Sequence, residues 1–520
     1  MEELADRLGG LILTGLHGTT VTDEAAQFIA GTAGAVLFRR NIATADQTRA
    51  LISALQSTRS SGRPPLIVAV DEEGGPVTRL DALGAWAPAA MALGAAADLD
   101  ITREVYARIG TDLRALGITL DFAPVADVNT SASNPIIGLR SFGGDAGAVS
   151  GHVSAAIRGL HDAGVAATAK HFPGHGGTRA DTHLHTVALD QTERHIRDVD
   201  LAPFRAAIDA GVDVVMAAHL SAPSLDQSAL PATRSPSLLR GVLRGELKFE
   251  GVICSDDMQM KGVGADISFE EAAVSSVKAG VDLLVYADLD AAKRALAALR
   301  TALGAGQLDK DQIEASLSRV DSLRTRERNP HVARQPRVGQ ALARDVASRA
   351  VTLVRARGGV PPLSLPAGAR VLIINFIEGG PTRSTGARVE SALGRALAAA
   401  GLRATEQLRD LDPAGHEYKQ LLLAAQSADA FVAITRRASA HPLQVQAVAD
   451  LALFGKPAIA VVALEPYDAA EIPDEIAVIA TFGDADVNLQ AAADVLLGSA
   501  VASGHIPVSL ARHTEQAHIT

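Results

Sequence analysis

The stretch VAATAKHFPGHGGTRADTHLHT, residues 165–186, joins a short apolar run to a loop that is rich in titratable groups. The run VAATAKHF has the length and the apolar character of a buried β-strand. From Lys170 onward the stretch also holds four histidines, three glycines and a proline, a composition that ends a strand rather than extends it. We therefore predict a strand over 165–172 whose carboxyl end opens into a polar loop.

Similar apolar runs recur along the first part of the chain. Up to about residue 325 they alternate with stretches rich in Ala, Leu and Arg that have a helical period, such as residues 102–117. The eight runs cover residues 10–15, 35–40, 65–73, 118–128, 165–172, 213–220, 251–258 and 282–289. Eight strands alternating with helices predict an α/β fold, a (β/α)8 TIM-type barrel over residues 1–325.

The rest of the chain predicts a second, smaller domain. Residues 324–340 are basic, contain two prolines and show no apolar period, so we place a linker at 326–345. Four further apolar runs, at 370–377, 430–436, 458–465 and 476–483, predict an α/β sandwich over residues 346–520. The glycine turn after the first of these runs lacks both the GxGxxG and the Walker pattern, so we expect a plain turn there and not a nucleotide site.

Composition limits the possible partners of the chain. The formal net charge of -11 gives no basic footprint for nucleic acid. The only cysteine, Cys254, cannot form an internal disulfide, and no apolar run is long enough to span a membrane. The beginning of the sequence lacks the apolar core of a secretory signal. We expect a cytoplasmic protein that binds neither nucleic acid nor membrane.

Polar residues gather at the carboxyl ends of the predicted barrel strands. They are Asp71, Asp127, Lys170, His171, His219, Asp256 and Asp288. In a (β/α)8 barrel the loops that follow the strands converge on this face, which is where active sites form. The sequence therefore predicts an active site that these residues surround.

The histidine-rich loop admits three interpretations. The first is a metal site, because His171, His175, His183, His185 and Asp181 are all acceptable zinc or manganese ligands. The segment Phe-Pro-Gly between His171 and His175 cannot continue a helix, so the loop lacks the helical pair of common zinc motifs. The second interpretation is a set of solvated loop histidines with no shared role.

The third interpretation is a catalytic dyad of Asp181 and His183. Residues i and i+2 of an extended segment project to the same side, so the carboxylate would hold the imidazole. Such a carboxylate fixes the histidine tautomer and leaves the other ring nitrogen free to exchange protons near neutral pH. The glycines at 174, 176 and 177 would let this loop move with the dyad.

Two consecutive acids close the run GVICSDDM at residues 251–258. Alternation along a strand would turn Asp256 and Asp257 to opposite sides, and Asp256 is the better candidate for a functional role. The alternative is that both are solvated or cap the next helix, an assignment that suits Asp257.

Four further charged residues at this face suit the binding of sugar hydroxyls: Asp71, Arg140, Lys170 and His171. The alternative is a set of structural ion pairs, for example one between Asp71 and Arg79, because buried charges persist when paired.

Taken together, these motifs resemble glycoside hydrolase family 3, and more closely its NagZ-like β-N-acetylglucosaminidase branch. The segments that carry the resemblance are LFRRNI, VDEEGG, DFAPVADV, NPIIGLRSFG, KHFPGHGGTRADTH, MAAHL and GVICSDDMQM, in this order between residues 37 and 260. The sequence departs from the family pattern in DTH, where DSH is commoner, and in VDEEGGPV, where VDQEGGRV is commoner. Threonine keeps the hydroxyl, whereas Pro76 removes a charge near the substrate rim and affects the expected aglycone preference.

The resemblance implies roles for individual residues. Asp256 corresponds to the nucleophile, and His183 assisted by Asp181 corresponds to the acid/base. Asp71, Arg140, Lys170 and His171 correspond to sugar-binding positions, and neither a metal nor another cofactor is expected.

The resemblance also implies an activity and a substrate. The expected protein is a retaining exo-β-N-acetylglucosaminidase that removes terminal GlcNAc from peptidoglycan-derived fragments, with a small GlcNAc-containing carbohydrate as its substrate. Two alternatives stay open. One is a phosphorylase of the same family that uses phosphate in place of water, and the other is a catalytically silent sugar-binding protein.

Overall fold

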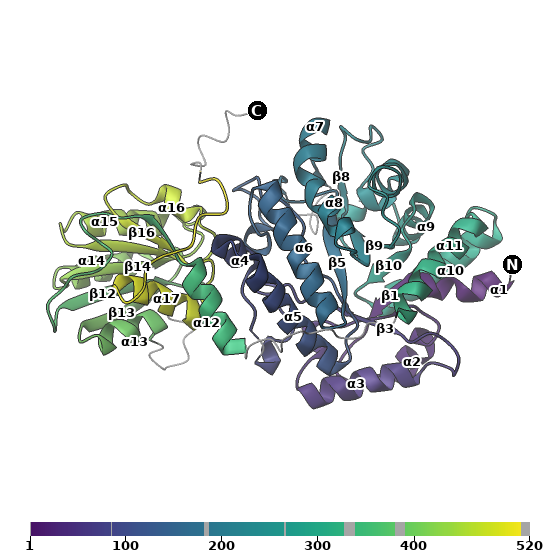
Figure 1. The fold of residues 1–520 in the computed structure, drawn as a ribbon, viewed down its shortest axis with the longest axis horizontal. Coiled ribbons are helices and arrows are strands. Elements are labelled where there is room, and N and C mark those ends of the chain that lie inside the picture. Colours follow the sequence, from purple (N-terminus) through teal and green to yellow (C-terminus); the bar gives the residue numbers. More distant parts are fainter. Residues whose placement is uncertain are drawn as a thin grey trace. The chain divides into compact units, whose positions relative to one another are not determined.

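The computed structural model describes residues 2–84, 86–180, 187–264, 267–326, 339–379 and 390–510. The chain forms two compact units (Figure 1). The first consists of Met1–Ala87 and Leu99–Gly339, and the second of Pro88–Asp98 and Gln340–Thr520.

The first unit is a closed barrel of eight parallel strands. Its strands are β1 (Ile12–Gly15), β2 (Gly34–Val36), β3 (Ile67–Val70), β4 (Leu120–Asp121), β5 (Ala166–Phe172), β7 (Val214–Ala217), β9 (Val252–Asp257) and β10 (Leu283–Tyr286). Each strand pairs with its neighbours in sequence, and β10 closes the barrel on β1. The predicted (β/α)8 barrel is confirmed, with a strand in each of the eight apolar runs. Strand β4 is short because Pro124 follows it and has no N–H for the ladder.

Helices alternate with the barrel strands as the sequence predicts (Figure 1). They include α2 (Asp23–Ile29), α3 (Ala45–Ser57), α5 (Leu99–Leu116), α6 (Ala146–Asp162), α8 (Ala202–Asp209), α9 (Phe269–Ala279), α10 (Leu289–Gly304) and α11 (Lys310–Thr325). Side-chain hydrogen bonds to backbone amides fix where several of these helices begin. The Asp145 side chain accepts a hydrogen bond from the Ala148 amide at the start of α6, and Ser268 and Glu271 form a capping box at the start of α9.

Aliphatic side chains fill the barrel interior. They include Leu13, Ile67, Leu120, Val214, Val252 and Leu283, all nearly inaccessible to solvent. Because the strands are parallel, their carboxyl ends meet on one face, and the polar residues that follow β3, β5 and β9 come together there.

The second unit is a six-stranded sheet in the order β11-β16-β15-β14-β12-β13. Its strands are β11 (Thr352–Arg355), β12 (Arg370–Phe376), β13 (Arg403–Arg409), β14 (Ala430–Thr435), β15 (Ala458–Val462) and β16 (Ala477–Ala480). Among the described strands of this sheet, β11 and β16 pair antiparallel and the other neighbours pair parallel. Each of the four predicted apolar runs contains a strand. The edge strand β13 has the sequence RATEQLR, which lacks an apolar run, and so the sequence pattern did not predict it.

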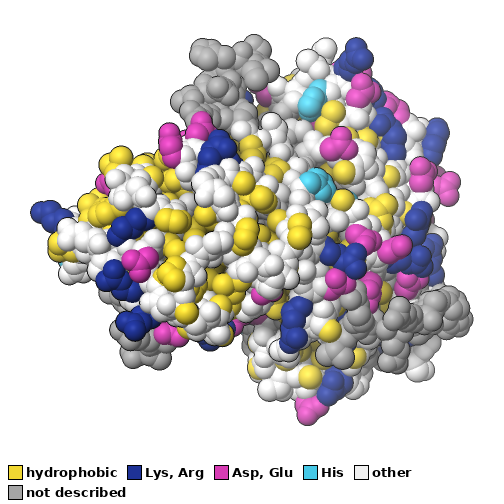
Figure 2. All heavy atoms as spheres, turned by 60° about the vertical axis from the view of Figure 1, so that its left-hand side comes forward, with side chains coloured by type: hydrophobic (Ala, Val, Ile, Leu, Met, Phe, Trp, Pro, Cys, Tyr) yellow, Lys and Arg dark blue, Asp and Glu magenta, His cyan; other side chains and the backbone are white. Residues whose placement is uncertain are grey.

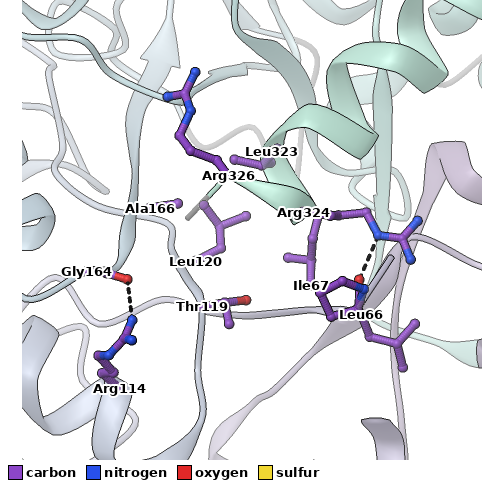
Figure 3. Close-up of a pocket in the computed structure, with 11 residues that line it drawn as sticks. Leu66, Ile67, Arg114, Thr119, Leu120, Gly164, Ala166, Leu323, Arg324 and Arg326 are labelled. Carbon is purple, nitrogen blue, oxygen red and sulfur yellow. Dashed lines mark hydrogen bonds between the residues drawn. The ribbon is translucent and has the colours of Figure 1, made fainter. Parts of the chain in front are cut away.

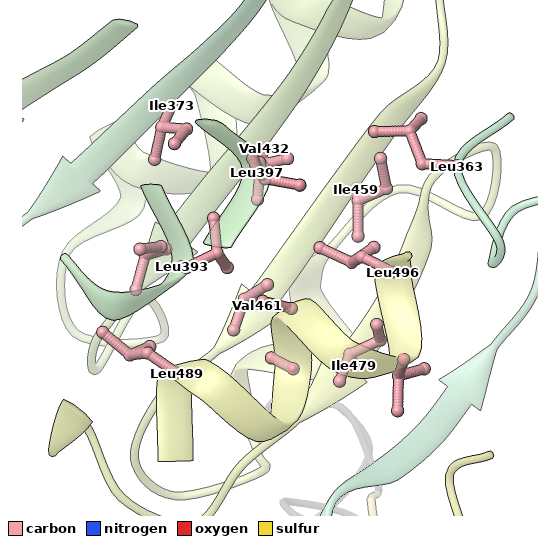
Figure 4. Packing of buried hydrophobic residues seen from close by; sticks show 14 of the residues in the cluster. Leu363, Ile373, Leu393, Leu397, Val432, Ile459, Val461, Ile479, Leu489 and Leu496 are labelled. Carbon is pink, nitrogen blue, oxygen red and sulfur yellow. The ribbon is translucent and has the colours of Figure 1, made fainter. Parts of the chain in front are cut away.

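Helices cover both faces of this sheet. Figure 4 shows Ile373, Val432, Val461 and Ile479 of the strands packed against Leu393 and Leu397 of α13 (Ala392–Ala399) and Leu489 and Leu496 of α17 (Asp486–Leu496). On the other face Leu372, Ile374 and Phe431 pack against α14 (Gly415–Ala425) and α15 (Pro442–Ala452). Successive strand residues thus point to opposite, equally apolar faces, which is the pattern of a buried parallel sheet.

A short segment from the first half of the chain belongs to the second unit. Helix α4 (Ala90–Ala96) lies within Pro88–Asp98, and its residues Met91 and Leu93 are buried. The Ala95 carbonyl accepts a hydrogen bond from the His505 amide, and Asp98 pairs with Arg349 of α12 (Gly339–Ala350) at 2.9 Å. The sequence analysis did not predict this grouping.

The surface shows charges of both signs. In Figure 2 the Lys and Arg side chains are interspersed with Asp and Glu, and on this face the described residues form no broad basic patch. No helix in the described part of the chain is long and apolar enough to cross a membrane.

Candidate active site

A cavity of about 280 Å³ lies at the carboxyl ends of the barrel strands. All four predicted sugar-binding residues, Asp71, Arg140, Lys170 and His171, line it together with Asp256. The structure therefore brings together every predicted site residue that it describes. Apolar side chains, among them Ile136, Met216 and Met260, complete the wall.

Glu73 binds two of the predicted sugar-binding cations. Its two carboxylate oxygens accept hydrogen bonds from Nε and Nη2 of Arg140, both at 2.8 Å. Lys170 Nζ lies 2.5 Å from Glu73 Oε1 and 2.8 Å from Asp71 Oδ1. Asp71 is thus paired with Lys170, whereas the sequence had suggested Arg79 as a partner.

These contacts keep the carboxylate of Glu73 ionised. Burial alone would raise the pKa of Glu73, but Arg140 and Lys170 outweigh it and hold that pKa well below its ordinary value. The sequence analysis assigned Glu73 no role. The sequence feature that could have indicated a role for Glu73 is its spacing from Asp71. The two residues lie two positions apart, so in an extended segment their side chains project to the same side.

Asp127 orients the ring of His171. Its fully buried carboxylate accepts a hydrogen bond at 2.7 Å from Nδ1 of His171, and Oδ1 accepts the amides of His171 and His175 at 3.1 and 2.6 Å. Nε2 of His171 lies 3.3 Å from Nη2 of Arg140, which can only donate. Asp127 and Arg140 thus contact the His171 ring at its two nitrogens and fix its orientation.

Asp256 is the second-last residue of strand β9 and lines the cavity. Burial would raise the pKa of Asp256, but His171, His219 and the amide of Asp257 outweigh it, so the pKa is lower than usual. An ionised carboxylate at neutral pH is what a nucleophile requires.

Asp257 and His219 have structural contacts instead. The Asp257 carboxylate accepts hydrogen bonds from the amides of Gln259 and Ala287 at 3.1 and 3.3 Å. Nε2 of His219 lies 3.0 Å from the Asp257 carbonyl, and Nδ1 lies 2.8 Å from Oγ1 of Thr233. Asp288, another strand-end acid, caps α10 by accepting the amides of Asp290 and Ala291. The three residues thus stabilise the loops around the cavity.

The loop that leaves β5 begins with a tightly packed stem, residues 172–180. Asn134 Nδ2 donates to the His175 carbonyl at 2.8 Å, and Oγ1 of Thr178 lies 2.7 Å from Nδ1 of His175. A Cβ at position 176 would lie 2.0 Å from the carbonyl oxygen of Val128, and one at position 177 would lie 2.5 Å from Nε2 of Gln191. These two glycines permit close packing, whereas the sequence analysis had interpreted them as a source of mobility.

The predicted dyad, Asp181 and His183, lies outside the described residues, as does His185. The dyad is therefore still a prediction from the sequence. Of the other two ligands in the metal interpretation, His171 contacts Asp127 and His175 contacts Thr178. Within the described ranges, no three His, Cys, Asp or Glu side chains are placed to share a metal ion.

A second cavity, of about 370 Å³, lies at the amino-terminal ends of the strands (Figure 3). Three arginines line it, but each already has a structural acceptor. Arg114 donates to the Gly164 carbonyl, Arg324 to the Pro64 and Pro65 carbonyls, and Arg326 to Asp213. Figure 3 shows the three guanidinium groups spread around the rim and not converging on its centre. Their contacts suit a stabilising role, which is usual at this end of a barrel.

Comparison with known proteins agrees with this geometry. The family model described as "Glycosyl hydrolase family 3 N terminal domain" matches residues 3–323. A Beta-hexosaminidase A from Pseudoalteromonas piscicida is 33% identical over 335 residues, which are 59% of this chain and 56% of that protein. A Beta-hexosaminidase from Pseudomonas aeruginosa is 40% identical over 301 residues, which are 56% of this chain and 86% of that protein.

Among the solved structures that match nearly the whole chain is a glycoside hydrolase family 3 beta-N-acetylglucosaminidase from Paenibacillus sp., with 32% sequence identity and a TM-score of 0.87. The match covers 98% of this chain and 99% of that one, so both units take part in it. By contrast, the chain spans little more than half the length of the Pseudoalteromonas protein.

Proposed function

Because the chain belongs to glycosyl hydrolase family 3, we propose that it is a retaining exo-β-N-acetylglucosaminidase that removes terminal, non-reducing GlcNAc from peptidoglycan-derived fragments. The observation that carries the proposal is the position of Asp256. Asp256 is the second-last residue of β9 and lines a cavity that the four candidate sugar-binding residues also line.

The cavity has the groups that a sugar ring requires. Lys170 and Arg140 donate hydrogen bonds and Asp71 accepts them, which suits hydroxyl groups that do both. Asp127 and Glu73 hold His171, Lys170 and Arg140 in place before a substrate arrives. Ordered donors and acceptors of this kind position a substrate at little further cost in conformational entropy.

The proposed reaction is a double displacement. Asp256 attacks the anomeric carbon while His183, held by Asp181, gives a proton to the leaving oxygen. His183 then takes a proton from a water molecule that attacks the same carbon, which releases GlcNAc and regenerates the Asp256 carboxylate. The roles of His183 and Asp181 rest on the sequence resemblance.

The test compares initial rates on a chromogenic β-N-acetylglucosaminide and on the matching β-glucoside, with the sugar product identified in buffers with and without phosphate. We expect a preference for the acetamido sugar and free GlcNAc in both buffers. GlcNAc 1-phosphate as the product would instead identify a phosphorylase, and the absence of turnover on both would favour a sugar-binding protein. Release of GlcNAc from GlcNAc-MurNAc fragments at a higher kcat/KM than from chitobiose would support the peptidoglycan substrate.

A further inference from the structure

Asp200 is a buried acid near the active site that has no part in the proposed reaction. It ends the short helical segment Ile196–Asp200, which follows α7 (Glu193–His195), and its exposed fraction is 0%. Neither carboxyl oxygen has a hydrogen-bond partner in the described part of the chain. Nε2 of His195 lies 3.9 Å from Oδ2 of Asp200, which is beyond hydrogen-bonding distance.

Asp200 lies directly against the turn that carries the histidines of the site. A Cβ at position 174 would lie 2.8 Å from Cβ of Asp200 and 3.3 Å from its Oδ1. Gly174 has a φ of 129° and donates its amide to the His171 carbonyl at 2.8 Å. Only a residue without a side chain fits between Asp200 and this turn.

The same turn is also held by Asp127. Asp127 accepts hydrogen bonds from Nδ1 and the amide of His171 and from the amide of His175. These donors stabilise its negative charge. Asp200 has no such donor in the described ranges. Two buried carboxylates close together, one of them without donors, cannot both carry a charge at low cost.

The electrostatic surroundings agree with a protonated Asp200. Burial, followed by the nearby charge of Asp127, raises the pKa of Asp200 to about 8. Among the described residues, the titratable groups that face Asp200 are Asp127, from the loop after β4, and His195, from the preceding turn of its own helical segment. On the side of the turn, Asp200 lies against Gly174, which has no side chain.

We propose that Asp200 is a positioning residue of the active site, whose uncharged carboxyl group supports the turn from His171 to His175 and whose ionisation disturbs that turn. The free-energy cost of a second buried negative charge beside Asp127 falls only if the turn moves or admits water. Either change loosens the hydrogen bonds that orient His171. The inference rests on the proposed glycosidase activity, because it assigns Asp200 a role in that site.

The test measures kcat and kcat/KM between about pH 6 and pH 10 on an activated aryl β-N-acetylglucosaminide. An activated leaving group needs little protonation, so loss of the His183 proton affects this rate least. We expect the wild-type protein to lose activity on the alkaline side. Asp200→Asn, which cannot ionise, should keep most of the neutral-pH activity and show no such loss. Asp200→Ala should lower kcat at every pH by roughly tenfold to a hundredfold, because the turn loses its support.

Asp198→Asn is the matched control, because Asp198 lies in the same helical segment with a side chain that is 65% exposed. It should leave the pH profile unchanged. An alkaline loss in Asp200→Asn equal to that of the wild type would overturn the proposal. So would a folded Asp200→Asn protein that is inactive at neutral pH, since it would mean that the charged form is the active one.

A second measurement does not depend on activity. The pKa of Asp200 is higher in the folded protein than in the unfolded chain, so its penalty on stability grows as pH rises from about 4 to about 8 and is constant above. The melting temperature of Asp200→Asn relative to wild type should therefore rise over this range. A lower melting temperature for Asp200→Asn at neutral pH would indicate a stabilising ion pair with His195 and overturn the proposal. If the wild type showed no glycosidase activity, this comparison would still test the state of Asp200, so the two failures can be distinguished.

Discussion

At the scale of single residues, Glu73 has the largest expected effect on stability. One carboxylate with a side chain that is 2% exposed pairs with both Lys170 and Arg140. We predict that Glu73→Gln lowers the free energy of unfolding by about 3–5 kcal/mol, because it leaves a buried cation without its partner. Urea denaturation measures this change. Glu24→Gln is the control, since Glu24 pairs with Lys293 on the surface and should change stability by less than about 1 kcal/mol.

The contribution of Glu73 should also depend on pH. Its pKa is lower in the folded protein than in the unfolded chain, where it is near 4.5, so the contribution is present above that pH and is lost as pH falls through and below it. The stability difference between wild type and Glu73→Gln should therefore shrink on acidification. A difference that stays constant down to about pH 3 would contradict this assignment of charge.

Asp256 and Asp257 provide a test of the nucleophile by neighbouring substitutions. Asp256→Asn should reduce kcat by at least about a thousandfold while the melting temperature changes little, because the amide cannot form the covalent intermediate. Asp257→Asn should instead lower stability and keep measurable turnover, since its carboxylate holds the amides of Gln259 and Ala287. Comparable losses of kcat in both variants would remove Asp256 from its proposed role.

For His183 the expected effect depends on the leaving group. His183→Ala should lower kcat/KM for natural disaccharides by about a hundredfold to ten-thousandfold, because a basic leaving oxygen needs a proton. Activated aryl substrates should lose much less. Steady-state rates on a series of aryl glycosides of graded leaving-group pKa measure this, and equal losses across the series would exclude His183 as the acid.

At the scale of elements, the stem of the histidine loop depends on close backbone packing. A Cβ at Gly176 meets the backbone oxygen of Val128 at 2.0 Å, whereas a Cβ at Gly177 meets side-chain atoms, those of Gln191 and Thr130. Backbone cannot yield without moving the stem, but a side chain can rotate. Gly176→Ala should therefore lower kcat by roughly a hundredfold, and Gly177→Ala much less. The same initial-rate assay compares the two, and equal activities would show that the stem position does not matter for turnover.

The elements of the barrel were predictable from local sequence for a physical reason. A strand buried on both faces must be apolar along its length, so runs such as residues 165–172 and 251–258 are visible without any structure. The edge strand β13 pairs with β12 alone, and its polar sequence carries no such signal. The residues of the site divide in the same way, into those that a local sequence pattern indicates and those that it does not. Asp256 and Lys170 stand at strand ends, but the roles of Glu73 and Asp200 depend on partners that are 67 and 26 positions away.

At the scale of the whole molecule, the described site belongs to one unit. Asp256 and the four candidate sugar-binding residues all lie in the barrel unit, so we predict that the second unit supplies no catalytic residue. A truncation near residue 335 is the direct test, but α4 complicates it. This helix belongs to the second unit, and no local pattern in the sequence indicates so.

The arrangement of α4 determines how the truncation must be made. Removing residues 340–520 also removes the His505 and Arg349 partners of the segment 88–98 and leaves its apolar residues, Met91 and Leu93, without their unit. We expect the simple truncation to aggregate, because exposed apolar helices associate. A truncation in which a Gly/Ser linker replaces residues 88–98 should stay soluble and retain turnover of aryl β-N-acetylglucosaminide. Circular dichroism and the initial rate measure the two properties, and a folded, soluble barrel without activity would show that the second unit contributes to the reaction.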